Sequence, residues 1–233
     1  MTDSNSDETR RDAQLKNTPG KGRTPTARAI EPNSPEEFGL VSVWWGNGKG
    51  KTTAALGMGF RAAGHGYRVH FLQFMKGGAS SVEDVRGEYN AIDAFPGFTY
   101  ETSGSYGWHG FLDESDDDEH EARAKAGLDR ARELLWGASG VSLDEPLALD
   151  GEPEEGVHML ILDEILYAAN RGLVEPEAVV ALVENKPPNL ELVLTGGHEP
   201  PEYVFEGADL VTEVKKHKHP FDAGQRARRG TEY

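Results

Sequence analysis

Short runs of hydrophobic residues recur along the chain, and apolar positions with helical spacing follow most of them. The runs lie at residues 40–45, 67–74, 98–102, 157–164, 190–197 and 208–214. Each run is short and rich in Val, Ile, Leu or aromatic residues, which predicts a strand. Because helices are expected between these strands, we predict an α/β fold of three layers, in which a mostly parallel sheet carries helices on both faces.

Helical periodicity places the covering elements between the strands. The predicted helices lie at residues 51–66, 116–136, 165–169, 176–184 and 201–205. The longest has an apolar stripe that includes Ala124, Leu128 and Leu135. Three Asp residues follow Ser115 at its start, and we interpret them as helix capping, with a metal site as the alternative.

The length of 233 residues suits one domain with a sizeable core and loose ends. Residues 1–38 show no periodicity, so we expect them to be disordered or to become ordered only against a ligand or partner. Residues 39–233 form the predicted domain, which includes an acidic insertion at about 137–156. We expect this insertion to be flexible and to carry no chemistry.

Charge and composition narrow the classes of partner. The chain has 40 Asp and Glu against 24 Lys and Arg, and a formal charge of −16 would repel nucleic acid. No apolar run approaches the roughly 20 residues that a membrane span needs, and no secretion signal opens the chain. We therefore expect a cytoplasmic protein without nucleic-acid or membrane partners, and the absence of cysteine fits a reducing compartment. The acidity also suggests a protein adapted to concentrated salt, which we treat as a hypothesis.

The segment WWGNGKGKTTAALG, residues 44–57, has the spacing of a phosphate-binding loop between a buried strand and a helix. Trp45 stands where the strict pattern has its first glycine, so the loop is a variant. Backbone N–H groups of such a loop converge on phosphate oxygens, Lys51 would neutralise phosphate charge, and Thr52 can reach Mg²⁺. The predicted nucleotide-binding residues are Gly46, Asn47, Gly48, Lys49, Gly50, Lys51 and Thr52.

A pair of carboxylates follows the most hydrophobic predicted strand, in the sequence LILDE. An acidic pair at this place is as often a helix start as a ligand. Beside a phosphate loop, however, a carboxylate at the end of a neighbouring strand can hold Mg²⁺, or Mn²⁺, or its waters. Asp163 and Glu164 are therefore predicted metal ligands together with Thr52, and Glu164 is expected to be the closer carboxylate.

Several short motifs, in this order, resemble the ATP:cob(I)alamin adenosyltransferases that carry a P-loop. They are GNGKGKTTAALG, GHG, QFMKG, GFTYET, LDEILYA and HPFDAGQRARRGTEY. The resemblance covers about Leu40 to Tyr233 except the acidic insertion, and it implies a P-loop NTPase (RecA-like) architecture. It also implies that the 5′-deoxyadenosyl group of ATP is transferred to the cobalt of a reduced corrinoid and that triphosphate is released, in adenosylcobalamin biosynthesis or salvage.

The resemblance also implies roles for individual residues and partners. Lys51, Thr52 and Glu164 would stabilise the departing triphosphate, since cob(I)alamin is itself the nucleophile. Asn47 would contact the adenosine side. Phe98 matches one member of an aromatic pair that displaces the axial ligand of cob(II)alamin, and Tyr100 replaces the tryptophan often seen as the other. Core packing is the alternative for two aromatics at strand spacing. The family is usually dimeric, and an electron donor must reduce cob(II) to cob(I).

The C-terminal residues 215–229 are basic within an acidic protein. They either form a solvated tail or contribute to the corrinoid or nucleotide pocket. His217 and His219 lie among lysines that would repel a cation, so no zinc site is predicted there.

Two other function classes remain open from the residues alone. A phosphoryl-transfer enzyme, such as an ATPase or kinase, would also use the loop and the acidic pair. A nucleotide-responsive binding protein would bind ATP tightly without turnover.

Overall fold

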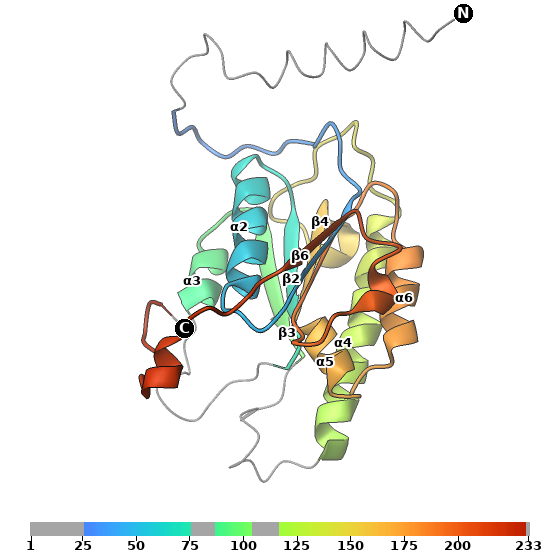
Figure 1. Ribbon diagram of the computed structural model, residues 1–233. Helices are drawn as coiled ribbons and strands as arrows, with labels where there is room; N and C mark the ends of the chain where they lie inside the picture. Colours follow the sequence, from blue (N-terminus) through green and yellow to red (C-terminus); the bar gives the residue numbers. More distant parts are fainter. Residues whose placement is uncertain (1–25, 76–86, 104–116, 232–233) are drawn as a thin grey trace, which may run out of the picture.

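A computed structural model describes residues 26–75, 87–103 and 117–231 (Figure 1). Within them, six strands form one parallel sheet in the order β3-β2-β4-β5-β1-β6. The strands are β1 (Val41–Trp45), β2 (Val69–Gln73), β3 (Phe98–Thr102), β4 (Met159–Asp163), β5 (Glu191–Thr195) and β6 (Leu210–Glu213). All six predicted strands are confirmed, and so is the parallel sheet.

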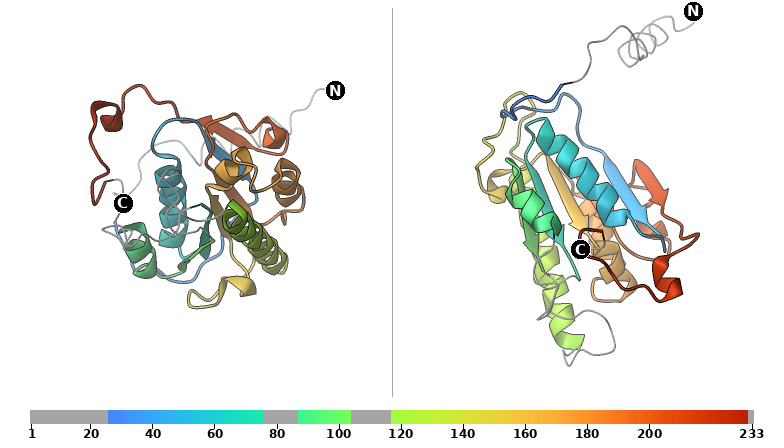
Figure 2. Two further views of the ribbon diagram at one scale, coloured as in Figure 1. Left: turned by 90° about the horizontal axis from the view of Figure 1, so that it is seen from below. Right: turned by 90° about the vertical axis from the view of Figure 1, so that its left-hand side faces the viewer.

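Helices cover both faces of the sheet, which confirms the three-layer prediction (Figures 1 and 2). On one face lie α2 (Lys51–Gly64) and α3 (Gly87–Asp93), and on the other lie α4 (Asp117–Ala138), α5 (Ile165–Asn170) and α6 (Pro176–Glu184). Short 3₁₀ helices occur at η1 (Pro153–Glu155), η2 (Glu202–Val204) and η3 (Pro220–Ala223). The motifs had given no signal for α3 or for η1 and η3.

Side chains along β4 alternate between the two faces of the sheet, so this strand contributes to two hydrophobic clusters. Leu160 and Leu162 belong to the cluster under α4, α5 and α6, whereas Met159 and Ile161 belong to the cluster under α2. All five residues of β4 are buried. This continuous hydrophobic run is typical of a central strand in a parallel sheet, and it places Asp163 at the carboxyl edge.

The acidic segment 137–156 contacts the rest of the domain at several points, which its composition did not predict. Asn189 donates a hydrogen bond to the carbonyl of Val141, and the guanidinium of Arg68 donates one to the carbonyl of Glu152. Pro153 is buried in η1, which packs against α4. The composition of the segment indicates its acidic surface, but it does not predict the few apolar and backbone contacts that hold the segment to the domain.

The N-terminal segment divides at the limit of the described residues. Residues 1–25, part of the segment predicted to be disordered, lie outside the described ranges. Residues 26–38 have no helix or strand, and Asn33 donates a backbone hydrogen bond of 3.0 Å to Gly66. Phe38 packs edge-on against Tyr67 at 5.3 Å between ring centroids. In the described ranges, no helix combines the length and the apolar character needed to cross a membrane.

Candidate functional site

The loop from Gly46 to Gly50 joins β1 directly to the first turn of α2, as its motif predicted. Gly46 and Gly50 have φ angles of 116° and 122°, which residues with a Cβ rarely adopt. The ammonium group of Lys51 turns into the loop and donates to the carbonyls of Gly46 at 2.7 Å and Gly48 at 3.1 Å. The positive charge therefore already lies within the loop that would receive a phosphate.

Backbone from the end of the chain forms one wall of the phosphate loop. The N–H of Gly48 donates to the carbonyl of Val214 at 2.7 Å, and the N–H of Gly46 donates to that of Gly197 at 3.1 Å. A Cβ on Gly46 would lie 2.5 Å from the Val214 oxygen, and one on Gly48 would lie 2.8 Å from it. A side chain at either position would clash with the backbone of Val214, the residue that follows β6.

Trp45 does not disturb the loop, although it replaces the first glycine of the strict pattern. Its ring packs against the core that includes Phe205, with 6.4 Å between ring centroids. The last residue of β1 can therefore be large, because its side chain is directed into the core on the α6 side. The variant loop is explained by this packing.

Asp163 and Glu164 are neighbours in sequence with different surroundings. Asp163 is fully buried, and its two oxygens accept hydrogen bonds from Thr195 Oγ1 at 2.6 Å and Gln73 Nε2 at 2.7 Å. Glu164 is only half-buried and precedes α5 in a left-handed conformation, with a φ of 63°. Such a backbone costs of order 1–3 kcal/mol and is often found at functional sites.

A hydrogen bond fixes the turn at Glu164. Its backbone N–H donates to Thr195 Oγ1 at 3.1 Å, and the same hydroxyl donates to Asp163. Asp163 thus supports the turn from inside, while Glu164 presents its carboxylate at the edge of the sheet. In the described parts of the chain, no group of three or more acidic or histidine side chains could hold a metal by itself. A cation here would depend on Glu164, Thr52 and the oxygens of its own ligand.

The hydrogen-bonded network of Thr195 and Asp163 continues to Gln73, which begins the QFMKG motif but had no predicted role, and to Tyr89, which no motif includes. Gln73, which is fully buried, bonds to Asp163 and also accepts from the hydroxyl of Tyr89 on α3. The ring of Tyr89 stacks on Tyr100 at 4.5 Å and an angle of 7°. The sequence offered one sign of this hydrogen-bonded network, a Gln at the end of a wholly buried strand. A buried amide needs hydrogen-bond partners.

Phe98 and Tyr100 point to the same face of β3 but differ in exposure. Phe98 is 3% exposed and packs edge-on against Phe60 at 5.1 Å, inside the core under α2. Tyr100 is 38% exposed and lies nearer the carboxyl edge of the sheet. In this structure Phe98 is a core residue, which agrees with the packing alternative, and Tyr100 is the aromatic on the surface.

Asn47 and Lys49 of the phosphate loop contact the C-terminal segment. Asn47 Oδ1 accepts a hydrogen bond from the backbone N–H of Lys216 at 2.9 Å, and Lys49 Nζ donates to the carbonyl of Thr231 at 2.9 Å. His219 accepts from the N–H of Phe221 at 3.1 Å and so caps η3. The basic tail therefore runs beside the nucleotide loop.

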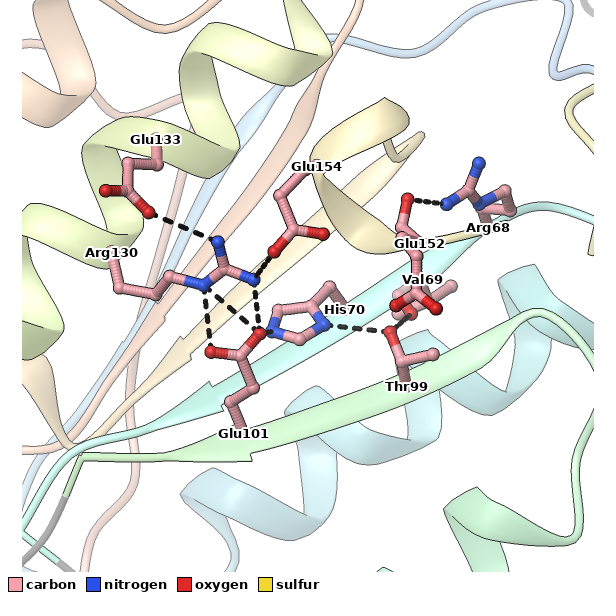
Figure 3. Close-up of polar contacts among 9 residues, drawn as sticks. All are labelled: Arg68, Val69, His70, Thr99, Glu101, Arg130, Glu133, Glu152 and Glu154. Atoms are coloured by element: carbon pink, nitrogen blue, oxygen red, sulfur yellow. Dashed lines mark hydrogen bonds and ion pairs between the residues drawn. The ribbon is translucent and has the colours of Figure 1, made fainter. Parts of the chain in front are cut away.

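A second polar cluster lies on the α4 face of the sheet (Figure 3). Arg130 on α4 binds Glu101 through Nε, at 3.1 Å and 2.8 Å from the two carboxylate oxygens, and also binds Glu133 and Glu154. His70 is 1% exposed and lies between Thr99, at 2.8 Å, and Glu101, at 3.6 Å. Burial lowers the pKa of His70 to about 4, although Glu101 opposes the shift.

This cluster joins three elements and does not reach the phosphate loop. It connects β3, α4 and η1, which explains how the acidic segment is fixed. Glu101 and Tyr100 point to opposite faces of β3, so the cluster is separated from the hydrogen-bonded network of Gln73 by the sheet. We interpret it as a structural network.

Comparison with known proteins adds a family match over most of the chain. Residues 37–233 match the family model described as ATP:corrinoid adenosyltransferase BtuR/CobO/CobP. A corrinoid adenosyltransferase of Pseudomonas aeruginosa is 34% identical over 199 residues, which cover 85% of each chain. The corrinoid adenosyltransferase CobA of Salmonella typhimurium is 31% identical over 204 residues, and the Escherichia coli K12 corrinoid adenosyltransferase is 32% identical over the same length. Both matches cover 85% of this chain and 87% of the relative.

Proposed function

The chain belongs to the ATP:corrinoid adenosyltransferase family, and from this membership we propose how its own residues support adenosyl transfer. The enzyme transfers the 5′-deoxyadenosyl group of ATP to a reduced corrinoid. The observation that carries this function is the family match across residues 37–233, which includes the phosphate loop, the carboxylate strand and the C-terminal segment.

The bond changes explain why the site needs no catalytic base. The electron pair of cobalt(I) forms the bond to carbon 5′ of ATP, and the bond from that carbon to the triphosphate oxygen breaks. Triphosphate leaves with the electron pair, so the protein has to stabilise growing negative charge. Lys51 and the N–H groups at the start of α2, from Lys51 to Thr53, would do this, because the N–H groups of Gly46 and Gly48 donate to protein carbonyls. Asn47 can donate its amide group to the adenosine side.

We propose a divalent cation at the polyphosphate, with Mg²⁺ first and Mn²⁺ as the alternative. The oxygens of Thr52 and Glu164 fit the preference of these ions for hard ligands. Thr52 lies in the first turn of α2 and Glu164 directly precedes α5, at the same edge of the sheet. When bound, the ion would neutralise part of the triphosphate charge. Asp163, the second predicted metal ligand, would hold the Glu164 turn through Thr195 and act on the ion or its waters from behind Glu164.

Corrinoid binding is assigned to the edge of the sheet near Tyr100. This aromatic is partly exposed and is held parallel to Tyr89. Phe98, which the resemblance pairs with it, would support this wall from the core and would reach the corrin only by leaving its packed position. An electron donor must supply cobalt(I), and we propose a homodimer in the cytoplasm as the working form.

A single anaerobic assay tests the proposed function. The protein is mixed with ATP, Mg²⁺ and chemically reduced corrinoid, and both the corrinoid spectrum and the phosphate products are followed. We expect a cobalt–carbon product and triphosphate in equal amounts. ADP with inorganic phosphate would indicate a phosphoryl-transfer enzyme, and tight ATP binding without turnover would indicate a binding protein.

A further inference from the structure

The C-terminal residues 214–231, here called the C-terminal strap, are attached to the phosphate loop at both ends. Near its start, the carbonyl of Val214 accepts from Gly48 and the N–H of Lys216 donates to Asn47. Near its end, Thr231 accepts from Lys49 at 2.9 Å. Three consecutive loop residues thus hold two points of the strap that are 17 residues apart in sequence. Between these points the strap leaves the loop and returns to it (Figure 2).

The two lysines of the loop point to different partners. Lys51 turns inward to the loop carbonyls, whereas Lys49 reaches outward to a neutral carbonyl of the strap. Lys49 had been predicted to bind nucleotide. Its contact with Thr231 gives it a second possible task, as an anchor for the strap.

The strap is the basic exception in an acidic protein. It contains six Lys and Arg against one acidic residue, Asp222, while the whole chain has a formal charge of −16. Lys216 Nζ pairs with Asp222 at 3.1 Å, and η3 gives the strap a local fold. Lys215 pairs with Glu213 at 3.0 Å. The other basic side chains belong to a segment that is held to the loop at both ends, so they should attract a polyanionic ligand of the loop over about a Debye length, roughly 10 Å at 0.1 M salt.

We propose that the C-terminal strap is a cationic cover for the polyphosphate and that Lys49 is a positioning residue that holds it there. The inference rests on the proposed function for its ligand, the triphosphate part of ATP. The proposed cover concerns only the retention of a polyphosphate, whereas the proposed function concerns adenosyl transfer. Inorganic tripolyphosphate is therefore a suitable probe, since it needs no corrinoid and no reductant.

The first test measures tripolyphosphate binding to the full chain by calorimetry, with three strap cations replaced in the variant Lys218→Gln/Arg226→Gln/Arg229→Gln. We expect binding about tenfold weaker in 0.05 M salt and a difference that nearly disappears in 1 M salt. The matched control, Arg123→Gln/Lys125→Gln/Arg132→Gln, removes the same charge from exposed positions of α4 and should change binding less than twofold. Equal weakening in both triple variants would overturn the proposal, because net charge alone would then explain it.

The second test separates an anchor from a phosphate ligand. Lys49→Met should weaken tripolyphosphate binding about fivefold in the full chain and should have no further effect in a chain that ends at Lys216. Lys51→Met should abolish binding in both backgrounds. If Lys49→Met weakens binding equally in both, Lys49 contacts the phosphate and the anchor role is wrong. Removal of the strap takes away no buried side chain of η3, and unchanged melting temperatures would verify that the shortened chain is folded.

The outcomes distinguish this proposal from the proposed function. Strap-dependent tripolyphosphate binding without adenosyl transfer would support the cover and contradict the enzymatic function. Adenosyl transfer with strap-independent binding would contradict only the cover.

Discussion

At the scale of single residues, Asp163 and Glu164 have separable tasks. Asp163→Asn should lower the free energy of unfolding by about 1–3 kcal/mol, because an amide group would face the donors Thr195 and Gln73. Glu164→Gln should leave stability nearly unchanged and should weaken the Mg²⁺ dependence of ATP binding. Denaturant unfolding and metal titrations of both variants measure the two effects. A destabilised Glu164→Gln that keeps normal Mg²⁺ dependence would reverse the assignment.

Phe98 and Tyr100 allow a second comparison at this scale. Phe98→Ala should cost about 3–5 kcal/mol of stability, since the ring is buried against Phe60. Tyr100→Ala removes only a surface stack and should cost about 0.5–1.5 kcal/mol. We expect Tyr100→Ala to retain ATP binding and to impair formation of four-coordinate cob(II)alamin, as followed by its absorption spectrum. An unchanged spectrum in Tyr100→Ala with a changed spectrum in a folded Phe98→Leu would favour the role that the resemblance gives to Phe98.

At the scale of elements, Arg130 is the link that fixes the acidic segment to the sheet. The side chain is 20% exposed and joins α4 to Glu101 on β3 and Glu154 in η1. Arg130→Met should lower the free energy of unfolding by about 1–3 kcal/mol, chiefly because Glu101, the least exposed of its partners, loses its charged hydrogen bonds. It should also increase protease cleavage between residues 137 and 156. Arg132→Met, two residues away on the same helix and 51% exposed, should cost less than about 1 kcal/mol. Equal stability of the two variants would contradict this role.

Two buried histidines near Arg68 should make the stability of the protein depend on pH. Burial lowers the pKa values of His70 and His158 to about 4, and the N–H of Arg68 donates to His158 Nδ1 at 3.0 Å. Since an unfolded histidine titrates near 6.5, the unfolded state binds more protons between about pH 6.5 and pH 4. Stability is therefore complete above pH 6.5 and is lost as the pH falls toward 4.

The expected loss between pH 7 and pH 5 is about 2 kcal/mol for each histidine. Denaturant unfolding at both pH values measures it. His70→Gln should reduce the difference between the two pH values, and the exposed His217→Gln should not. If the wild-type and His70→Gln proteins lose the same stability, His70 is protonated in the folded protein and the argument fails.

The elements that the sequence predicted best are those in which hydrophobic pattern and local chemistry agree. Every strand was predicted, and Gly46–Thr52 was placed correctly between strand and helix because that motif is contiguous. Gln73, Tyr89 and Thr195 were missed because hydrogen bonds across the sheet bring together residues from distant parts of the chain. The contacts of segment 137–156 with Arg68 and Asn189 were missed for the same reason.

At the scale of the whole molecule, the chain has 40 acidic and 24 basic residues. Screening of these charges by salt should affect folding and ligand binding in opposite directions. Self-repulsion of a chain with a formal charge of −16 should weaken the compact state at low ionic strength. Salt screens this repulsion, since the Debye length falls from about 10 Å at 0.1 M to about 3 Å at 1 M. The same screening weakens the attraction between the C-terminal strap and a polyphosphate. We therefore expect stability to rise and affinity to fall over the same range of salt.

This expectation is measurable on the unmodified protein. Between 0.05 M and 1 M NaCl, the melting temperature should rise by about 2–8 °C, which corresponds to a gain of roughly 1–2 kcal/mol for a chain of this size. The dissociation constant for ATP should increase over the same range. Sucrose at equal osmolality is the control for effects of excluded solute, and it should stabilise the fold without weakening ATP binding. A melting temperature and an activity that stay constant from low to high salt would show that self-repulsion is negligible, and they would remove the support for adaptation to concentrated salt. A rise in stability with unchanged ATP affinity would instead show that the strap charges lie too far from the nucleotide to act on it.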